Sequence, residues 1–182
     1  YQQAQALSDK AFPRNAPAGL NYGMQYQTAG SLVLDFNHSD SLHYKRELDL
    51  SQAISSVTYQ SGGITYKREY IALISKKAIV VRLTASKPGS ISCTLDINTP
   101  FKEFEKAVKD GRMIFSGSSS STDNKVGRIR YQTQVLPQLE GGKLSTTDGK
   151  LKIENADAVN ILIAIGTNFK NYKDISADEA AV

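Results

Sequence analysis

Apolar and polar positions recur along this chain with two different spacings. Ala4, Leu7 and Ala11 follow one another at the spacing of a helix face, which predicts a helix at the N-terminus. Pro13 and Pro17 end that helix, because proline has no amide hydrogen with which to continue it. Beyond them the apolar positions recur at every second residue, the spacing of a β-strand with one buried face.

Segments with this alternation predict about ten strands joined by short turns. Gly62-Gly63 and Asp148-Gly149 lie between apolar runs, where glycine supplies the positive φ that a tight hairpin needs. Because helices do not alternate with the strands, we predict an all-β fold: an antiparallel β-sandwich with a short N-terminal helix. The predicted strands lie around residues 32–36, 44–50, 57–59, 64–74, 79–83, 91–97, 113–115, 129–135, 144–146, 151–153 and 159–165.

Two further segments carry helical signals. Phe101, Phe104 and Val108 have helical spacing, so this segment is either one short internal helix or a covering loop. The run from Ser176 to Glu179 has the pattern of a capping box, which predicts a helix that begins at Ser176. Since the sequence ends three residues after Glu179, we expect the polypeptide to continue beyond it.

Composition excludes several classes of protein. The 22 basic and 18 acidic residues are scattered, and nucleic-acid binding would need a clustered basic patch with stacking aromatic residues. No run of apolar residues approaches the length of about 18 that a membrane-spanning helix requires. The single cysteine, Cys93, lies in the cleanest alternating segment, so we interpret it as a small core residue rather than a nucleophile.

Candidate catalytic chemistry is sparse. The chain has two histidines, His38 and His43, with Asp40 between them, and this spacing does not converge well on a metal ion. We therefore expect surface histidines, no bound metal and no cofactor, and no serine triad can be built without a suitable histidine. The strand alternation points most acidic residues to solvent, so no pair of catalytic carboxylates stands out. The nine tyrosines favour strand packing over a sugar-stacking platform.

An ordered series of motifs resembles glycoside hydrolase family 95. The run Met24–Phe36, with Tyr26-Gln27 near its start, is similar to a motif of that family that leads into a strand. The run Tyr44–Leu50 resembles the family's Y-R-R-E-L-D-L, and the same order and spacing continue to Lys87–Ser90. The resemblance covers nearly the whole chain. It departs from the family at Ser31, where Asp or Asn is usual, and in lacking the family's usual opening segment, which contains Trp and an N-G-R-L-G type run.

The resemblance implies an inverting alpha-L-fucosidase, which acts on fucosylated or L-galactosylated glycans with a carboxylic acid and an activated water. It implies an N-terminal β-sandwich, a central (α/α)6 barrel with the catalytic groups, and a C-terminal β-domain, in a bacterial protein that is periplasmic or secreted. This chain resembles the first domain only, so no catalytic residue carries over and the barrel becomes its expected partner. Tyr26 and Gln27 are candidates for a loop at the rim of the sugar pocket.

We accordingly divide the chain into a leading helix and loop (1–20), a β-sandwich domain (21–172), and the start of a linker helix (173–182) toward a catalytic domain. Two alternatives remain open. One is a stand-alone carbohydrate-binding or adhesin-type β-sandwich. The other is the sandwich domain of another (α/α)6 glycosidase or of a phosphorylase.

Overall fold

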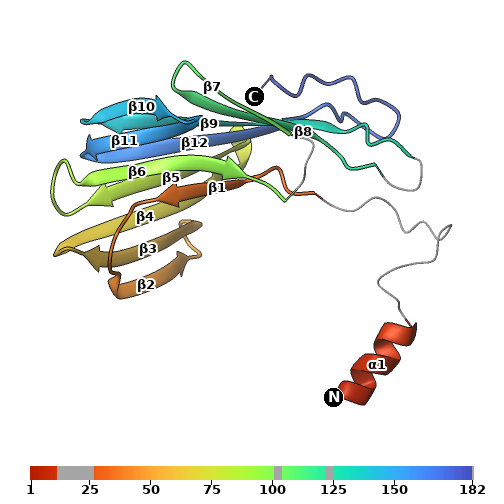
Figure 1. Ribbon diagram of the computed structural model, residues 1–182, viewed down its shortest axis with the longest axis horizontal. Helices are drawn as coiled ribbons and strands as arrows, with labels where there is room; N and C mark the ends of the chain where they lie inside the picture. The colour runs from red at the N-terminus through yellow and green to blue at the C-terminus, as the bar shows by residue number, and fades with distance from the viewer. Residues whose placement is uncertain (12–26, 101–103, 122–124, 182) are drawn as a thin grey trace.

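The protein is built from two antiparallel β-sheets (Figure 1). The computed structural model describes residues 1–11, 27–100, 104–121 and 125–181. The four-stranded sheet has the order β1 (Ser31–Asp35), β6 (Ile91–Asn98), β11 (Lys150–Ala156) and β10 (Lys143–Thr147). The eight-stranded sheet has the order β2 (Leu42–Asp49), β3 (Ile54–Ser61), β4 (Ile64–Leu73), β5 (Ala78–Ala85), β12 (Ala158–Thr167), β9 (Arg130–Glu140), β8 (Arg112–Ser118) and β7 (Phe104–Lys109). The all-β sandwich predicted from the alternation is confirmed.

The hydrophobic core lies between the two sheets. Strand β6 shows how the sequence produces it, because every second residue from Ile91 to Ile97 is buried and the residues between them are not. Cys93 is one of these buried residues, and burial raises the pKa of its thiol to about 12. Its interpretation as a core residue is confirmed. The largest fully buried apolar side chains are Leu83, Ile91, Leu95, Met113, Phe115, Val135, Leu151, Ile153, Val159 and Ile161.

Both predicted hairpins are confirmed. Gly62 and Gly63 join β3 to β4, and both have positive φ. Asp148 and Gly149 join β10 to β11 with φ of 50° and 69°, which are the left-handed values that a two-residue hairpin turn requires. The N-terminal helix is also present as α1 (Gln2–Ala11), and none of its residues is buried.

The segment with helical spacing around Phe104 is a strand, not a helix. Phe104 and Val108 lie four residues apart, a spacing that places two side chains on one face of a strand as well as of a helix. In the strand β7, Val108 packs against the core and the Phe104 ring lies 5.2 Å from that of Phe115. Phe101 lies outside the described residues. Between residues 27 and 181, the described parts of the chain contain one internal helix, the 3-10 turn Ile74–Lys76 at the end of β4.

No helix begins at Ser176 in the described residues, which run to Ala181. The glutamate that would complete the capping box, Glu179, instead accepts two hydrogen bonds from Arg130 on β9, at 2.7 and 3.1 Å. Gln134 of β9 also donates to the backbone oxygen of Ala180, at 3.2 Å. This segment therefore lies against the eight-stranded sheet and does not form the linker helix that the sequence suggested.

Candidate functional site

The structure describes one of the two residues suggested for a sugar-pocket rim. Gln27 donates to the hydroxyl of Ser120 and accepts from the backbone N–H of Ser120, both at 2.8 Å. This double hydrogen bond ties the segment before β1 to the loop that follows β8. Tyr26 lies outside the described residues. A sugar contact at Tyr26 or Gln27 therefore stays a prediction.

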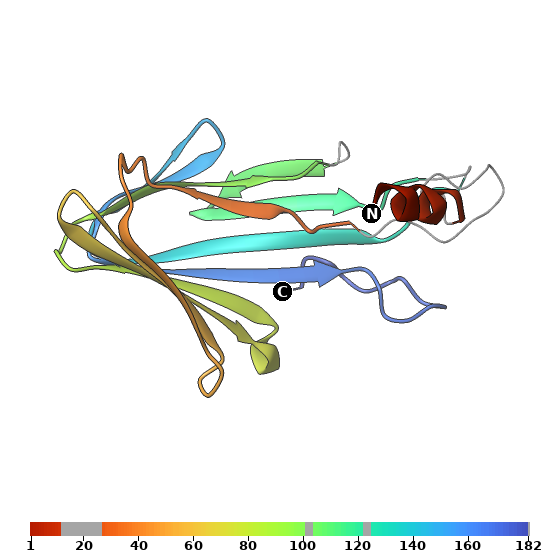
Figure 2. The same cartoon turned by 90° about the horizontal axis from the view of Figure 1, so that it is seen from below.

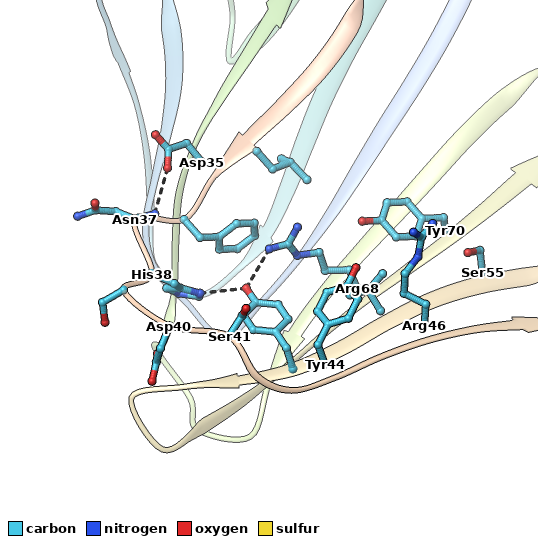
Figure 3. Close-up of a pocket in the computed structure, with 15 residues that line it drawn as sticks. Asp35, Asn37, His38, Asp40, Ser41, Tyr44, Arg46, Ser55, Arg68 and Tyr70 are labelled. Atoms are coloured by element: carbon cyan, nitrogen blue, oxygen red, sulfur yellow. Dashed lines mark hydrogen bonds between the residues drawn. The ribbon is translucent and has the colours of Figure 1, made fainter. Parts of the chain in front are cut away.

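An open groove of ≈ 990 Å³ lies elsewhere, between β1 and the edge of the eight-stranded sheet (Figure 3). One wall is the end of β1 and the turn that follows it. The floor is the face of β2, β3 and β4 that is directed toward the four-stranded sheet. Its lining residues are Leu34–Ser41, Tyr44, Arg46, Ser55, Val57, Tyr59, Arg68 and Tyr70.

Strand pairing aligns the floor of the groove. Arg46 of β2 is paired with Val57 of β3, and Val57 is paired with Arg68 of β4. Residues directly opposite one another in an antiparallel pair point to the same face, so both guanidinium groups lie on the groove side. Alternation along residues 44–50 is typical of a strand with one buried face, but every residue of β2 is exposed.

Tyr59 of β3 links the turn that follows β1 to Arg68 of β4. Its hydroxyl oxygen accepts a hydrogen bond from Nη2 of Arg68 at 2.9 Å and lies 2.9 Å from Nδ1 of His38. Arginine can only donate, so the Tyr59 hydroxyl hydrogen is free to donate to Nδ1 of His38. Burial, followed by the positive charge of Arg68, lowers the pKa of His38. Both observations favour a neutral imidazole, and Nδ1 accepts from Tyr59 in the tautomer that carries its proton on Nε2.

Aromatic rings enclose this polar centre. The Arg68 guanidinium lies 4.3 Å from the centroid of the Phe36 ring, and the His38 ring lies 4.4 Å from that of Tyr66. The expectation of a surface histidine was therefore wrong for His38, which is half-buried in this cluster. Neither its spacing nor its neighbours in sequence could have signalled this, because Tyr59 and Arg68 come from other strands. The Nε of Arg68 is buried and has no hydrogen-bond partner among the described residues.

The carboxylates near the groove are engaged in its turns. Asp35 accepts from the backbone N–H of Asn37 at 3.1 Å (Figure 3). Asp40 accepts from the hydroxyl of Ser61 at 2.6 Å. Glycoside hydrolysis needs an acid and a second carboxylate on opposite sides of the scissile bond. The groove instead offers two arginines, a histidine and tyrosines, which suit binding and packing. The described residues contain no group of three or more metal-ligating side chains.

Comparison with known proteins identifies the kind of domain. Residues 1–172 match the family model described as the N-terminal domain of glycosyl hydrolase family 65. The chain belongs to this family. The chain is also 30% identical to alpha-L-fucosidase 2 of Arabidopsis thaliana over 167 residues. This match covers 79% of the chain and 20% of the fucosidase. Among solved structures the chain is similar to a putative kojibiose phosphorylase from the human microbiome, with a TM-score of 0.51 and 7% identity. That match covers 82% of this chain and 23% of the phosphorylase, and it concerns the fold alone.

These findings confirm that the chain belongs to a family of N-terminal domains of glycosyl hydrolases. The resemblance to family 95 pointed to this kind of domain, while the matching model is named for family 65. The chain spans about a fifth of the length of the fucosidase relative. No helix in the described parts of this domain is long and apolar enough to cross a membrane.

Proposed function

We propose that these residues form the non-catalytic N-terminal sandwich of an inverting, alpha-L-fucosidase-like glycoside hydrolase. The observation that carries the proposal is the 30% identity to a plant alpha-L-fucosidase across most of the chain. The substrates would be fucosylated or L-galactosylated glycans, cleaved in a separate (α/α)6 barrel on which this domain packs. A secreted or periplasmic location belongs to the same proposal.

The groove supports a non-catalytic role. Its polar centre is a histidine hydrogen-bonded to a tyrosine, and the tyrosine is also hydrogen-bonded to an arginine. None of these three groups replaces the acid and base carboxylates of an inverting hydrolase. Asp35 and Asp40 are already bonded to a backbone N–H and to a serine hydroxyl.

A phosphorylase is the second candidate, and the fold similarity to a putative kojibiose phosphorylase favours it. The full-length protein separates the two. An alpha-L-fucosidase releases fucose from an aryl alpha-L-fucoside without added phosphate. A phosphorylase needs inorganic phosphate and forms a sugar phosphate.

The same aryl fucoside tests whether this domain is catalytic. We expect turnover by the full-length protein and none by residues 1–182 alone. Turnover by the isolated residues would overturn the proposal. Calorimetric titration of residues 1–182 with fucosylated oligosaccharides tests the third alternative, because a stand-alone carbohydrate-binding module would show measurable affinity.

A further inference from the structure

A smaller pocket of ≈ 430 Å³ lies where β7 begins and β8 ends (Figure 1). It is lined by the ends of three neighbouring strands, β7, β8 and β9, and by Glu179 of the C-terminal segment. It shares no described lining residue with the groove around Arg68. Its volume lies within the range of about 300–1,000 Å³ that is typical of pockets for small ligands.

One wall of this pocket is aromatic. Phe104 of β7 is paired with Gly117 of β8, and Gly117 is paired with Tyr131 of β9. The Tyr131 ring lies across the glycine, because a Cβ added at Gly117 would be 2.5 Å from the hydroxyl oxygen of Tyr131. A glycine in a strand often marks such a close approach. The wall therefore presents two aromatic rings with no side chain between them.

Phe104 provides the accessible part of this wall. Its ring is stacked on that of Phe115 with 5.2 Å between the centroids, and Phe115 is 0% exposed. Phe104 itself is 41% exposed. The core thus holds the ring from one side, while the rest of it is open to solvent. A ring that is already fixed loses little conformational entropy when a ligand packs against it.

The other wall is polar and is also held in place. Arg130 donates to both carboxylate oxygens of Glu179, at 2.7 and 3.1 Å. The backbone N–H of Arg130 donates to the side chain of Asn168 at 2.9 Å. After β12 the chain turns back and brings its C-terminus alongside β12 and β9 (Figure 2), where Gln134 bonds to the residue after Glu179. Both partners of the ion pair are therefore anchored.

The pocket offers hydrogen-bond donors and acceptors together. A guanidinium has five N–H groups, so the two bonds from Arg130 to Glu179 leave donors for a ligand. Glu105 also lines the pocket and is exposed, and it forms none of the ion pairs found in the described residues. An ionised carboxylate only accepts hydrogen bonds. A ligand with hydroxyl groups can use both kinds of partner.

This set of groups suits an uncharged sugar better than an anion. A phosphate or carboxylate would meet the carboxylates of Glu105 and Glu179, and the guanidinium that lines the pocket already neutralises one of them. A pyranose ring instead has C–H groups on its face, which pack against an aromatic ring, and hydroxyl groups around its edge. Phe104 matches the face of such a sugar, and Arg130 and Glu105 match its hydroxyl groups.

We propose that the pocket between Phe104 and Arg130 is a subsite for a hexopyranose of the glycan substrate. This rests on the proposed function, in which the fucose that is cleaved lies in the catalytic barrel. The pocket would then hold a sugar beyond the scissile bond. It would add affinity for the glycan and take no part in bond cleavage.

Steady-state kinetics of the full-length protein test the subsite with two substrates. Fucosyllactose carries further sugars beyond its fucose, whereas an aryl alpha-L-fucoside carries none. We expect Phe104→Ala to raise the KM for fucosyllactose about tenfold relative to the KM for the aryl fucoside. The matched control is Tyr172→Ala, which removes an aromatic side chain that is 84% exposed outside the pocket and should change neither KM. An unchanged ratio of the two KM values in Phe104→Ala would overturn the proposal.

Phe104→Ala also removes a contact with the core, so a second variant tests the polar side of the pocket. Glu105 is exposed, and we expect Glu105→Ala to fold normally. Loss of its hydrogen bonds to the sugar should raise the same KM ratio about threefold. Glu47→Ala removes an exposed carboxylate from β2 and should leave the ratio unchanged. Equal ratios in these two variants would contradict the subsite.

Lactose binding separates failure of the subsite from failure of the proposed substrate, because lactose contains no fucose. In calorimetric titration of the full-length protein, we expect Phe104→Ala to bind lactose about tenfold more weakly than the parent. That result in a protein that does not cleave the aryl fucoside would refute the fucosidase activity while supporting the subsite. Fucoside turnover without lactose binding, or with equal binding in both proteins, would refute the subsite alone.

Discussion

Asn168 is the buried polar side chain on which the C-terminal part of the domain depends most directly. It follows β12 and is 0% exposed. Its side-chain nitrogen donates to the backbone oxygen of Arg128 at 3.0 Å, and its side-chain oxygen accepts from the backbone N–H of Arg130 at 2.9 Å. Its backbone oxygen accepts from the N–H of Ala177 at 3.0 Å. One side chain thus joins the start of β9 to the segment that follows β12.

Replacing Asn168 by alanine would leave two backbone groups without partners. Each buried donor or acceptor that loses its partner costs about 1–3 kcal/mol. The two groups at Arg128 and Arg130 therefore predict a loss of about 2–6 kcal/mol in the free energy of unfolding. Because domains of this kind are stable by only about 5–15 kcal/mol, the loss would be a large fraction of the total.

Urea denaturation followed by circular dichroism measures this loss. The matched control is Asn171→Ala, since Asn171 is exposed and its side chain accepts one hydrogen bond, from the N–H of Lys173 at 2.9 Å. We expect the control to change stability by less than about 0.5 kcal/mol. A loss below about 1 kcal/mol for Asn168→Ala, or equal losses for both variants, would refute the reasoning.

Three further outcomes follow from named contacts. Gly30→Ala should lower the free energy of unfolding, measured in urea, by about 2 kcal/mol, because at φ +102° the new Cβ would lie 2.8 Å from a core side chain. Gly62→Ala should cost less, since nothing lies within 4 Å of a Cβ at Gly62. Equal losses for the two variants would contradict this. Burial raises the pKa of Asp96, but hydrogen bonds from two lysines and the charge of one of them outweigh it, so the pKa is lowered. The stability that Asp96 contributes is therefore present above the unfolded-state pKa of about 4 and is lost as the pH falls through its native pKa. Asp96→Asn should flatten the acid side of a plot of the free energy of unfolding against pH, and an unchanged plot would refute this. Tyr59→Phe removes the hydroxyl that lies 2.9 Å from Nδ1 of His38. If that hydroxyl donates to the neutral ring, its loss should raise the pKa of His38 in an NMR titration, and a fall would refute this direction of the hydrogen bond.

Local pattern was sufficient for much of the fold. Turn glycines and strict alternation predicted the hairpins at Gly62-Gly63 and Asp148-Gly149 and the buried face of β6, because both depend on backbone geometry within a few residues. The segment around Phe104 was ambiguous, because a spacing of four satisfies both periodicities. Its pairing with β8 decided in favour of a strand.

The candidate site could not be read from the chain in the same way. His38, Tyr59 and Arg68 come from the turn after β1, from β3 and from β4, and no spacing links them. Glu179 fitted a capping box, yet it forms an ion pair with Arg130, which lies 49 positions earlier in the sequence. Long-range contacts of this kind replace the local interaction that a motif predicts.

Alternation by itself determined which residues share a face: in β2 as in β5, every second side chain points toward the other sheet. Only the tertiary structure decided whether that face is buried. Val81 and Leu48 occupy the same row and the same side of one sheet, yet they are 3% and 63% exposed. The direction of a side chain follows from the pleat of its own strand, whereas its burial depends on whether a second layer lies opposite, and β1 is where the described layer ends.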